Sequence, residues 1–307
     1  MLGVVVFIFL KIILPIFALI GTGFVAQKTL KMDSRTFSRV TIYIFVPAIM
    51  FVKMYSAKVD LQFFSTIFLF IAGISALMFV IGEITARALG YSRSKRKAFS
   101  NALTFYNSGN YGLPLADLVF KSSPIAASVQ VFIMLIQNTT GNTVGVFQAS
   151  SANSSYRKAL RHVFKMPSLY VLALIVICNY FTLVVPEPVM VPLRYLADGF
   201  IAVALITLGV QLAEIEFTHK ISDVLLPCFI RLILSPILGF LLAALMGIKG
   251  ELAQALIIGV STPSAVNTAI LAKEFNSEPD YAAKIVVYST ILSGVTMSLV
   301  IYCLRFI

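Results

Sequence analysis

The sequence predicts an all-α polytopic membrane protein with ten transmembrane helices, because of its composition, its apolar runs and the placing of its basic residues. Hydrophobic residues make up 59% of the 307 residues and charged residues only 12%, and the mean hydropathy is +0.94. A soluble domain carries about 25% charged residues, so this chain has too little charge to cover a water-facing surface. Runs such as LFIAGISALMFVIG show no alternation of polar and apolar residues, which excludes the strands of a membrane β-barrel.

Ten segments stay apolar over about the 20 residues that a helix needs to cross a bilayer. Short loops join these segments and leave no room for a soluble domain. The first segment lacks the basic start of a secretory signal peptide, so it is predicted to be a span. The predicted spans are 3–27, 35–56, 61–88, 96–120, 124–150, 166–185, 190–214, 221–247, 251–274 and 280–306.

Basic residues gather in alternate loops, and this sets the predicted orientation. Cytoplasmic loops of membrane proteins are enriched in Lys and Arg, so both termini are predicted to face the outside of the cell (plasma or inner) membrane. The net charge of +11 lies in these loops, and nucleic acid is therefore not an expected partner. The clusters after spans 1, 3 and 5 are Lys28, Lys31, Arg35 and Arg39; Arg87, Arg93, Lys95, Arg96 and Lys97; and Arg157, Lys158, Arg161 and Lys165.

The ten spans divide into two sets of five, residues 1–155 and 156–307. An odd number of spans in each half makes the two halves insert in opposite directions, as in many transporters. The run ALTFYNSGNYGLPLADLVF in span 4 aligns with ALIIGVSTPSAVNTAILAKEF in span 9. Each begins apolar, meets a polar stretch with Pro and Asn, and then becomes apolar again. We therefore expect two inverted five-helix repeats.

Spans 4 and 9 are predicted to be broken near mid-membrane and to cross there. A break exposes N–H groups at a new helix N-terminus, which carry about half a positive charge, and two such ends would together bind an anion. The alternative is that the prolines only kink their helices, as is expected of Pro15, Pro47 and Pro236. The candidate substrate-binding or crossover residues are Asn107, Asn110 and Pro114 in span 4, and Ser261, Thr262, Pro263 and Asn267 in span 9.

Two further polar features lie inside predicted spans. Asn142 in span 5 is expected either to contact substrate or to form a hydrogen bond with a neighbouring helix. Arg231 in span 8 is a candidate charge partner of a carboxylate substrate, or else of Asp198 or Glu83. Ionisable groups at this depth are functional candidates because an isolated charge in the bilayer is costly.

Neither a metal site nor a cofactor is predicted. The three cysteines, Cys178, Cys228 and Cys303, are far apart and form no CxxC pair, and the two histidines fall in loops. The sequence contains no HExxH, GxSxG, P-loop or GxGxxG motif. An enzyme is therefore not predicted.

The chain resembles the auxin efflux carrier family, which comprises the plant PIN carriers and bacterial organic-anion carriers. The similarity runs over almost the full length and is most specific in spans 4 and 9. It implies a scaffold built from spans 1, 2, 6 and 7, and a moving transport part built from spans 3–5 and 8–10. Homodimerisation through the scaffold is implied by this resemblance alone. Further segments that carry it are RTFSRVTIYIFVPAIMF, ALITLGVQL, LSPILG and YAAKIVVYSTILSGVTMSLVIY.

The link between the halves, 151–165, is short as in the bacterial relatives, whereas the plant members carry a long loop. The resemblance therefore implies a malate- or malonate-like carboxylate as substrate rather than auxin. We expect a secondary transporter that moves a small organic anion across the lipid bilayer by alternating access, with coupling to a proton or to sodium left open. The alternatives are a sodium-coupled symporter of the bile-acid type and a membrane sensor that binds its ligand without moving it.

Overall fold

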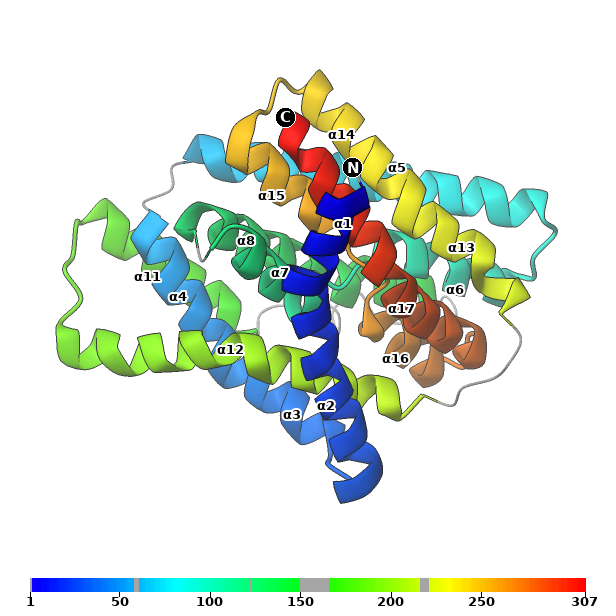
Figure 1. The fold of residues 1–307 in the computed structure, drawn as a ribbon, viewed down its shortest axis with the longest axis horizontal. Helices are drawn as coiled ribbons and strands as arrows, with labels where there is room; N and C mark the ends of the chain where they lie inside the picture. Colours follow the sequence, from blue (N-terminus) through cyan, green and yellow to red (C-terminus); the bar gives the residue numbers. More distant parts are fainter. Residues whose placement is uncertain (1, 58–60, 122, 150–165, 216–220) are drawn as a thin grey trace.

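The protein is an assembly of packed helices, as predicted (Figure 1). In the parts of the chain that are described, the backbone is helical apart from short connections, and no β-strand forms. Tyr106 and Ser264 make one isolated antiparallel bridge there. The predicted link 151–165 and the predicted boundary between the halves lie outside the described residues. The computed structural model describes residues 2–57, 61–121, 123–149, 166–215 and 221–307.

The helices of the first half correspond to the predicted spans, and some of them extend a few residues beyond the predicted ends. Spans 1 and 2 contain α1 (Leu2–Ile8), η1 (Phe9–Ile13), α2 (Leu14–Leu30), α3 (Ser34–Val40), η2 (Thr41–Phe45) and α4 (Val46–Ala57). Spans 3 to 5 contain α5 (Leu61–Ala88), α6 (Arg93–Thr104), η3 (Ser108–Gly112), α7 (Leu113–Val119), α8 (Pro124–Thr140), η4 (Gly141–Gly145) and α9 (Val146–Ala149).

The helices of the second half also correspond to predicted spans. Spans 6 to 8 contain α11 (Pro167–Tyr180), α12 (Glu187–Ala213), η5 (Ser222–Val224), α13 (Leu225–Phe229), η6 (Ile230–Leu234) and α14 (Ser235–Leu245). Spans 9 and 10 contain α15 (Gly250–Ser261), α16 (Val266–Glu274), α17 (Pro279–Cys303) and η7 (Leu304–Phe306).

Six helical runs among the described residues are long and apolar enough to cross a membrane. Helices of this length and composition are typical of a multi-pass membrane protein. The predicted spans 4 and 9 are not among them, because each is divided by non-helical residues. Span 6 holds a helix of 14 residues. The six runs are Leu2–Leu30, Ser34–Ala57, Gln62–Ala88, Glu187–Ala213, Ser222–Leu245 and Pro279–Phe306.

Prolines inside the spans determine where the helices widen. Pro15, Pro47, Pro114 and Pro236 each lie two residues after the end of a π-helical turn, namely η1, η2, η3 and η6. A proline lacks the N–H that would bond to the carbonyl four residues earlier, and its ring clashes with that carbonyl. The preceding turn therefore takes in one extra residue. The distortion predicted at three of these prolines has this form.

The helices α2, α4, α11 and α12 pack together as one group. Helices α2 and α12 cross closely (Figure 1) because glycines face the partner backbone. A Cβ on Gly23 would overlap the carbonyl of Ile206, and a Cβ on Gly209 would overlap that of Ile20. Small residues at such crossings let two backbones approach within a membrane. A buried cluster that joins α4, α11 and α12 includes Ile49, Met54, Ile175, Met190 and Phe200.

A second group contains the two interrupted helices, which are α6 with α7 and α15 with α16. The helices packed around them are α5, α8, α14 and α17. Helix α5 packs on α6, and α14 packs on α15. Helix α8 contacts α15 and α7, whereas α17 contacts α6 and α16. The interrupted helices are therefore enclosed by elements from both halves of the sequence.

Candidate functional site

The two predicted interruptions are both present, and they meet. Helix α6 ends at Thr104, and helix α15 ends at Ser261. The extended residues that follow run antiparallel to each other. The Asn107 N–H donates to the Pro263 carbonyl at 2.8 Å, and the Ala265 N–H donates to the Phe105 carbonyl at 3.0 Å. Backbone groups that lose their helical partners thus pair with each other, as a buried backbone requires.

The first break lies earlier than the sequence indicated. The glycine- and proline-containing stretch Ser108–Pro114 is helical, as η3 and the start of α7, and the non-helical residues are Phe105–Asn107. Pro114 follows the π-helical turn η3, which runs directly into α7, and this wider turn accommodates the proline. In the second half, Pro263 lies inside the break itself, as predicted.

The carbonyl groups at the ends of α6 and α15 converge on Arg231, which is 0% exposed. Its Nη1 donates to the Leu103 carbonyl at 2.9 Å, and its Nε donates to the Thr262 carbonyl at 3.1 Å. Its Nη2 donates to the Val260 carbonyl. Its guanidinium carbon lies 4.8 Å from the centroid of the Tyr106 ring. The last carbonyls of a helix lack partners within it, and here one side chain supplies partners to both helices.

Arg231 does not form the ion pairs considered from the sequence. Among the described residues, its bonds go to carbonyl groups rather than to Asp198 or Glu83. Glu83 instead lies 3.2 Å from Arg87 and 3.4 Å from Arg96, between its Oε2 and their guanidinium nitrogens. Arg231 stands where two helix ends are negative, and the planar guanidinium with five donors suits several carbonyls at once.

The opposite ends of the breaks offer N–H groups. Asn107 caps η3, since its Oδ1 accepts from the Asn110 N–H at 3.2 Å. The side chain is buried, and its Nδ2 has no hydrogen-bond partner among the described residues. Helix α16 begins after Ala265, which provides no side-chain cap. The crossing therefore presents two helix N-termini and an unused amide donor, which is a setting that favours an anion.

The other predicted residues lie around this crossing in different settings. Asn110 is half-buried on η3 and Asn267 is exposed on α16. The hydroxyls of Ser261 and Thr262 are fully buried and donate to carbonyls of α15, so their protons are already used. Asn142 lies half-buried on η4, which packs against α16.

Three polar residues that are not among the candidate site residues also form hydrogen bonds at or near the crossing. Gln137 accepts from the Tyr106 N–H at 3.4 Å through Oε1, and Ser264 donates through Oγ to the Ala102 carbonyl at 2.8 Å. Gln130 donates to the Ala255 carbonyl at 2.6 Å, and its buried Oε1 has no partner among the described residues. The seven-residue spacing of Gln130 and Gln137 places both on one face of α8, and this spacing is a signal that could have identified them.

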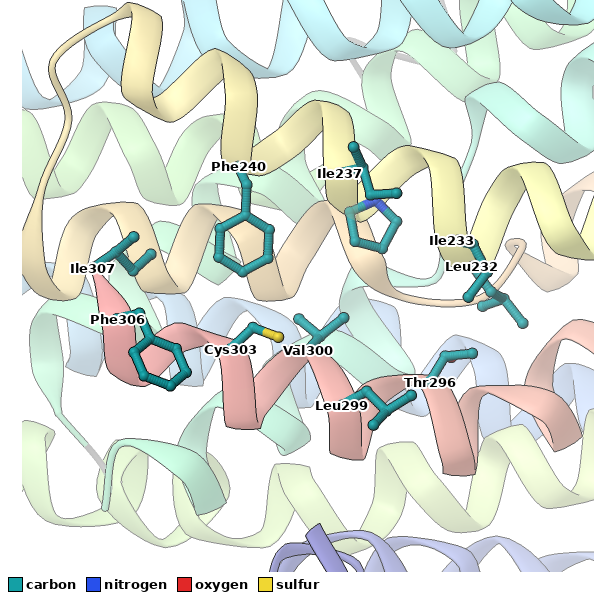
Figure 2. Close-up of a pocket in the computed structure, with 11 residues that line it drawn as sticks. Leu232, Ile233, Ile237, Phe240, Thr296, Leu299, Val300, Cys303, Phe306 and Ile307 are labelled. Carbon is teal, nitrogen blue, oxygen red and sulfur yellow. The ribbon is translucent and has the colours of Figure 1, made fainter. Parts of the chain in front are cut away.

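A separate groove of about 430 Å³ lies between η6–α14 and α17 (Figure 2). Its lining is apolar apart from Thr296, so it does not provide the donors that an anion needs. Figure 2 shows Ile237 and Phe240 on one side and Leu299, Val300 and Cys303 on the other. This groove is distinct from the crossing.

Comparison with known proteins identifies the family. The family model described as "Membrane transport protein" matches residues 8–159 and 148–301. An uncharacterised transporter of Methanothermobacter thermautotrophicus is 24% identical over 303 residues, which cover 97% of this chain and 95% of that protein. An uncharacterised transporter of Methanocaldococcus jannaschii is 23% identical over 280 residues, covering 87% of this chain and 88% of that protein. The chain therefore belongs to the membrane transport protein family, to which the auxin efflux carriers belong, and is a multi-pass membrane transporter.

Proposed function

We propose that the protein is a secondary transporter that moves a small organic anion, a malate- or malonate-like carboxylate, across the cell membrane by alternating access. The observation that carries this proposal is the anion-favouring setting at the crossing. Both η3 and α16 begin at the crossing, and the Asn107 Nδ2 there is buried and unpaired among the described residues. A carboxylate would bind such donors without a cation from the protein.

The packing of the helices supports two inverted repeats, 1–155 and 156–307, with ten spans in all. If spans 1 to 5 correspond to spans 6 to 10, the contacts of one half should recur in the other. The contact of α5 with α6 corresponds to that of α14 with α15, and the contact of α7 with α8 corresponds to that of α16 with α17. The contact of α8 with α15 likewise corresponds to that of α17 with α6. In this arrangement the first group of helices is the scaffold and the second is the transport part.

The placing of the chain ends supports the proposed orientation. Both ends lie at the top of the view in Figure 1, and α1 packs against α17. Two ends on one side of the membrane agree with an even number of spans and with both termini outside. A homodimer through the scaffold remains part of the proposal.

An ion pair joins the proposed scaffold to the proposed transport part. The Lys53 Nζ on α4 lies 3.3 Å from the Asp117 Oδ1 on α7, and the side chains are 17% and 13% exposed. If α7 moves relative to α4 during transport, this pair must break in each cycle.

Lys53→Met is expected to raise the exchange rate of labelled carboxylate several-fold. A pair of this kind contributes about 1 kcal/mol, and removing it destabilises the conformation in which the pair forms. The rate would be measured by counterflow in proteoliposomes. The charge-swapped double variant Lys53→Asp, Asp117→Lys should return the rate toward that of the unaltered protein. An unchanged rate in Lys53→Met would show that the pair takes no part in the moving interface.

Counterflow of labelled malate in proteoliposomes tests the proposed function. Vesicles preloaded with unlabelled malate or malonate should accumulate the label, and unlabelled substrate outside should compete with it. Binding without flux across a broad panel of organic acids would favour a ligand sensor instead. Absence of both binding and flux across that panel would contradict an organic anion as substrate.

A further inference from the structure

The Arg231 side chain carries a full positive charge and is fully buried within the helix bundle. A buried charge is tolerated only where its surroundings compensate it. Here the compensation comes from carbonyl groups, since the guanidinium donates to Leu103, Val260 and Thr262. No carboxylate among the described residues forms an ion pair with it.

The three carbonyls belong to the C-terminal ends of two different half-helices. Leu103 lies in the last turn of α6, Val260 lies in the last turn of α15, and Thr262 follows directly. Each helix C-terminus carries about half a negative charge, so the two ends together balance about one cation. The Val260 carbonyl also accepts from Ser235 Oγ at 2.8 Å. The bonds thus fix the guanidinium between α6 and α15.

We propose that the Arg231 guanidinium occupies the position of a coupling cation, so that transport proceeds without sodium. In transporters with interrupted helices, unwound carbonyls and half-helix C-termini coordinate the sodium ion. In this chain the same kind of carbonyl set is already occupied by a covalently attached cation. This inference rests on the proposed function, and it decides against the sodium-coupled alternative. Arg231 is then a positioning residue, which holds the two half-helices together and leaves their partner N-termini for the anion.

The first test uses the unaltered protein. Replacing sodium by choline at constant ionic strength should leave both the rate of malate counterflow and the melting temperature in detergent unchanged. A melting temperature or a counterflow rate that depends specifically on sodium would overturn the proposal. The melting temperature needs no substrate, so this measurement remains informative if malate is not transported and the proposed function fails.

The second test removes the cation and returns it as a free molecule. Arg231→Ala should lower the melting temperature by roughly 5–10 °C, because several buried carbonyls lose their donor. Guanidinium at about 10 mM, far below denaturing concentrations, should restore much of this loss by binding the folded state. Tetramethylammonium, which has no N–H or O–H group to donate to the carbonyls, should have no effect. A full melting temperature in Arg231→Ala, or no response to guanidinium, would contradict a cation site.

Matched variants separate charge from size. Arg231→Met keeps the length of the side chain without the charge and should be as unstable as Arg231→Ala; normal stability would overturn the proposal. Arg231→Lys keeps the charge but lacks the planar fork, and we expect intermediate stability that does not depend on sodium. Arg194→Ala is the control, because it removes an exposed arginine whose partner Glu187 is also exposed. The melting temperature of this variant should not change when guanidinium is added. If neither Arg231→Ala nor Arg231→Met folds, the sodium test on the unaltered protein decides.

Discussion

Asn107→Asp is expected to abolish carboxylate transport while leaving the crossing folded. Asparagine and aspartate cap helices about equally well, so an aspartate oxygen can still accept from the Asn110 N–H as Oδ1 does now. The Nδ2 donor, however, becomes a second negative oxygen at the place where the anion is proposed to bind. Losing a hydrogen bond to a charged group costs about 1.5–3 kcal/mol, and charge repulsion adds to this. The counterflow rate should therefore fall by roughly 100-fold or more.

Asn107→Ala distinguishes capping from binding. Alanine loses both the cap, which contributes about 1 kcal/mol, and the donor, but it introduces no negative charge. We expect a lower melting temperature than for Asn107→Asp together with a smaller loss of transport. Asn179→Asp, at a half-buried position on α11, controls for a new acidic residue elsewhere. Normal transport by Asn107→Asp would remove this residue from the binding site.

Gly23→Ala is expected to prevent normal packing of α2 against α12. The added Cβ would overlap the carbonyl of Ile206, which belongs to a backbone and cannot rotate away as a side chain can. The two helices must then separate, and this cost is about 3 kcal/mol or more, at the upper end of overpacking effects. The variant should show a lower yield of monodisperse protein in detergent and a clearly reduced melting temperature.

Gly21→Ala is the matched control for that experiment. Gly21 lies two residues earlier in the same helix, and a Cβ built on it meets no atom within 4 Å. Alanine also favours a helix over glycine by up to about 1 kcal/mol. The melting temperature of this variant should therefore equal or slightly exceed that of the unaltered protein. An equal effect of the two substitutions would show that helix propensity, rather than the close crossing, accounts for the loss.

Local chemistry allowed much of the architecture to be predicted from the sequence. The apolar runs placed the helices, because a bilayer leaves few other structures for such a composition. Pro263 marked the second break correctly, since a proline there cannot donate to a helix. Pro114 was a poor marker of the first break, because the π-helical turn before it lets the helix continue through the proline. The extended residues Phe105–Asn107 contain no helix breaker, and their conformation depends on partners far away in the sequence.

The partners at the crossing were the least predictable part. Arg231 was recognised as an unusual charge, but its carbonyl partners come from helix ends whose positions depend on both breaks. Gln130 and Gln137 lie in an apolar span, and their backbone partners belong to segments that are distant in the sequence. The roles of Asn107 and Arg231 are predictions, which the variants described above test.

The pairing of the two breaks also constrains the order of events during synthesis. The Phe105 carbonyl and the Asn107 N–H obtain their partners from Ala265 and Pro263, and the Leu103 carbonyl obtains its partner from Arg231. All three partners are translated more than a hundred residues later, as the sequence positions show. Before those residues are synthesised, these backbone groups must form hydrogen bonds with water or with the insertion machinery, because lipid offers no partners. The centre of the first half can therefore reach its final form only after the second half has entered the membrane.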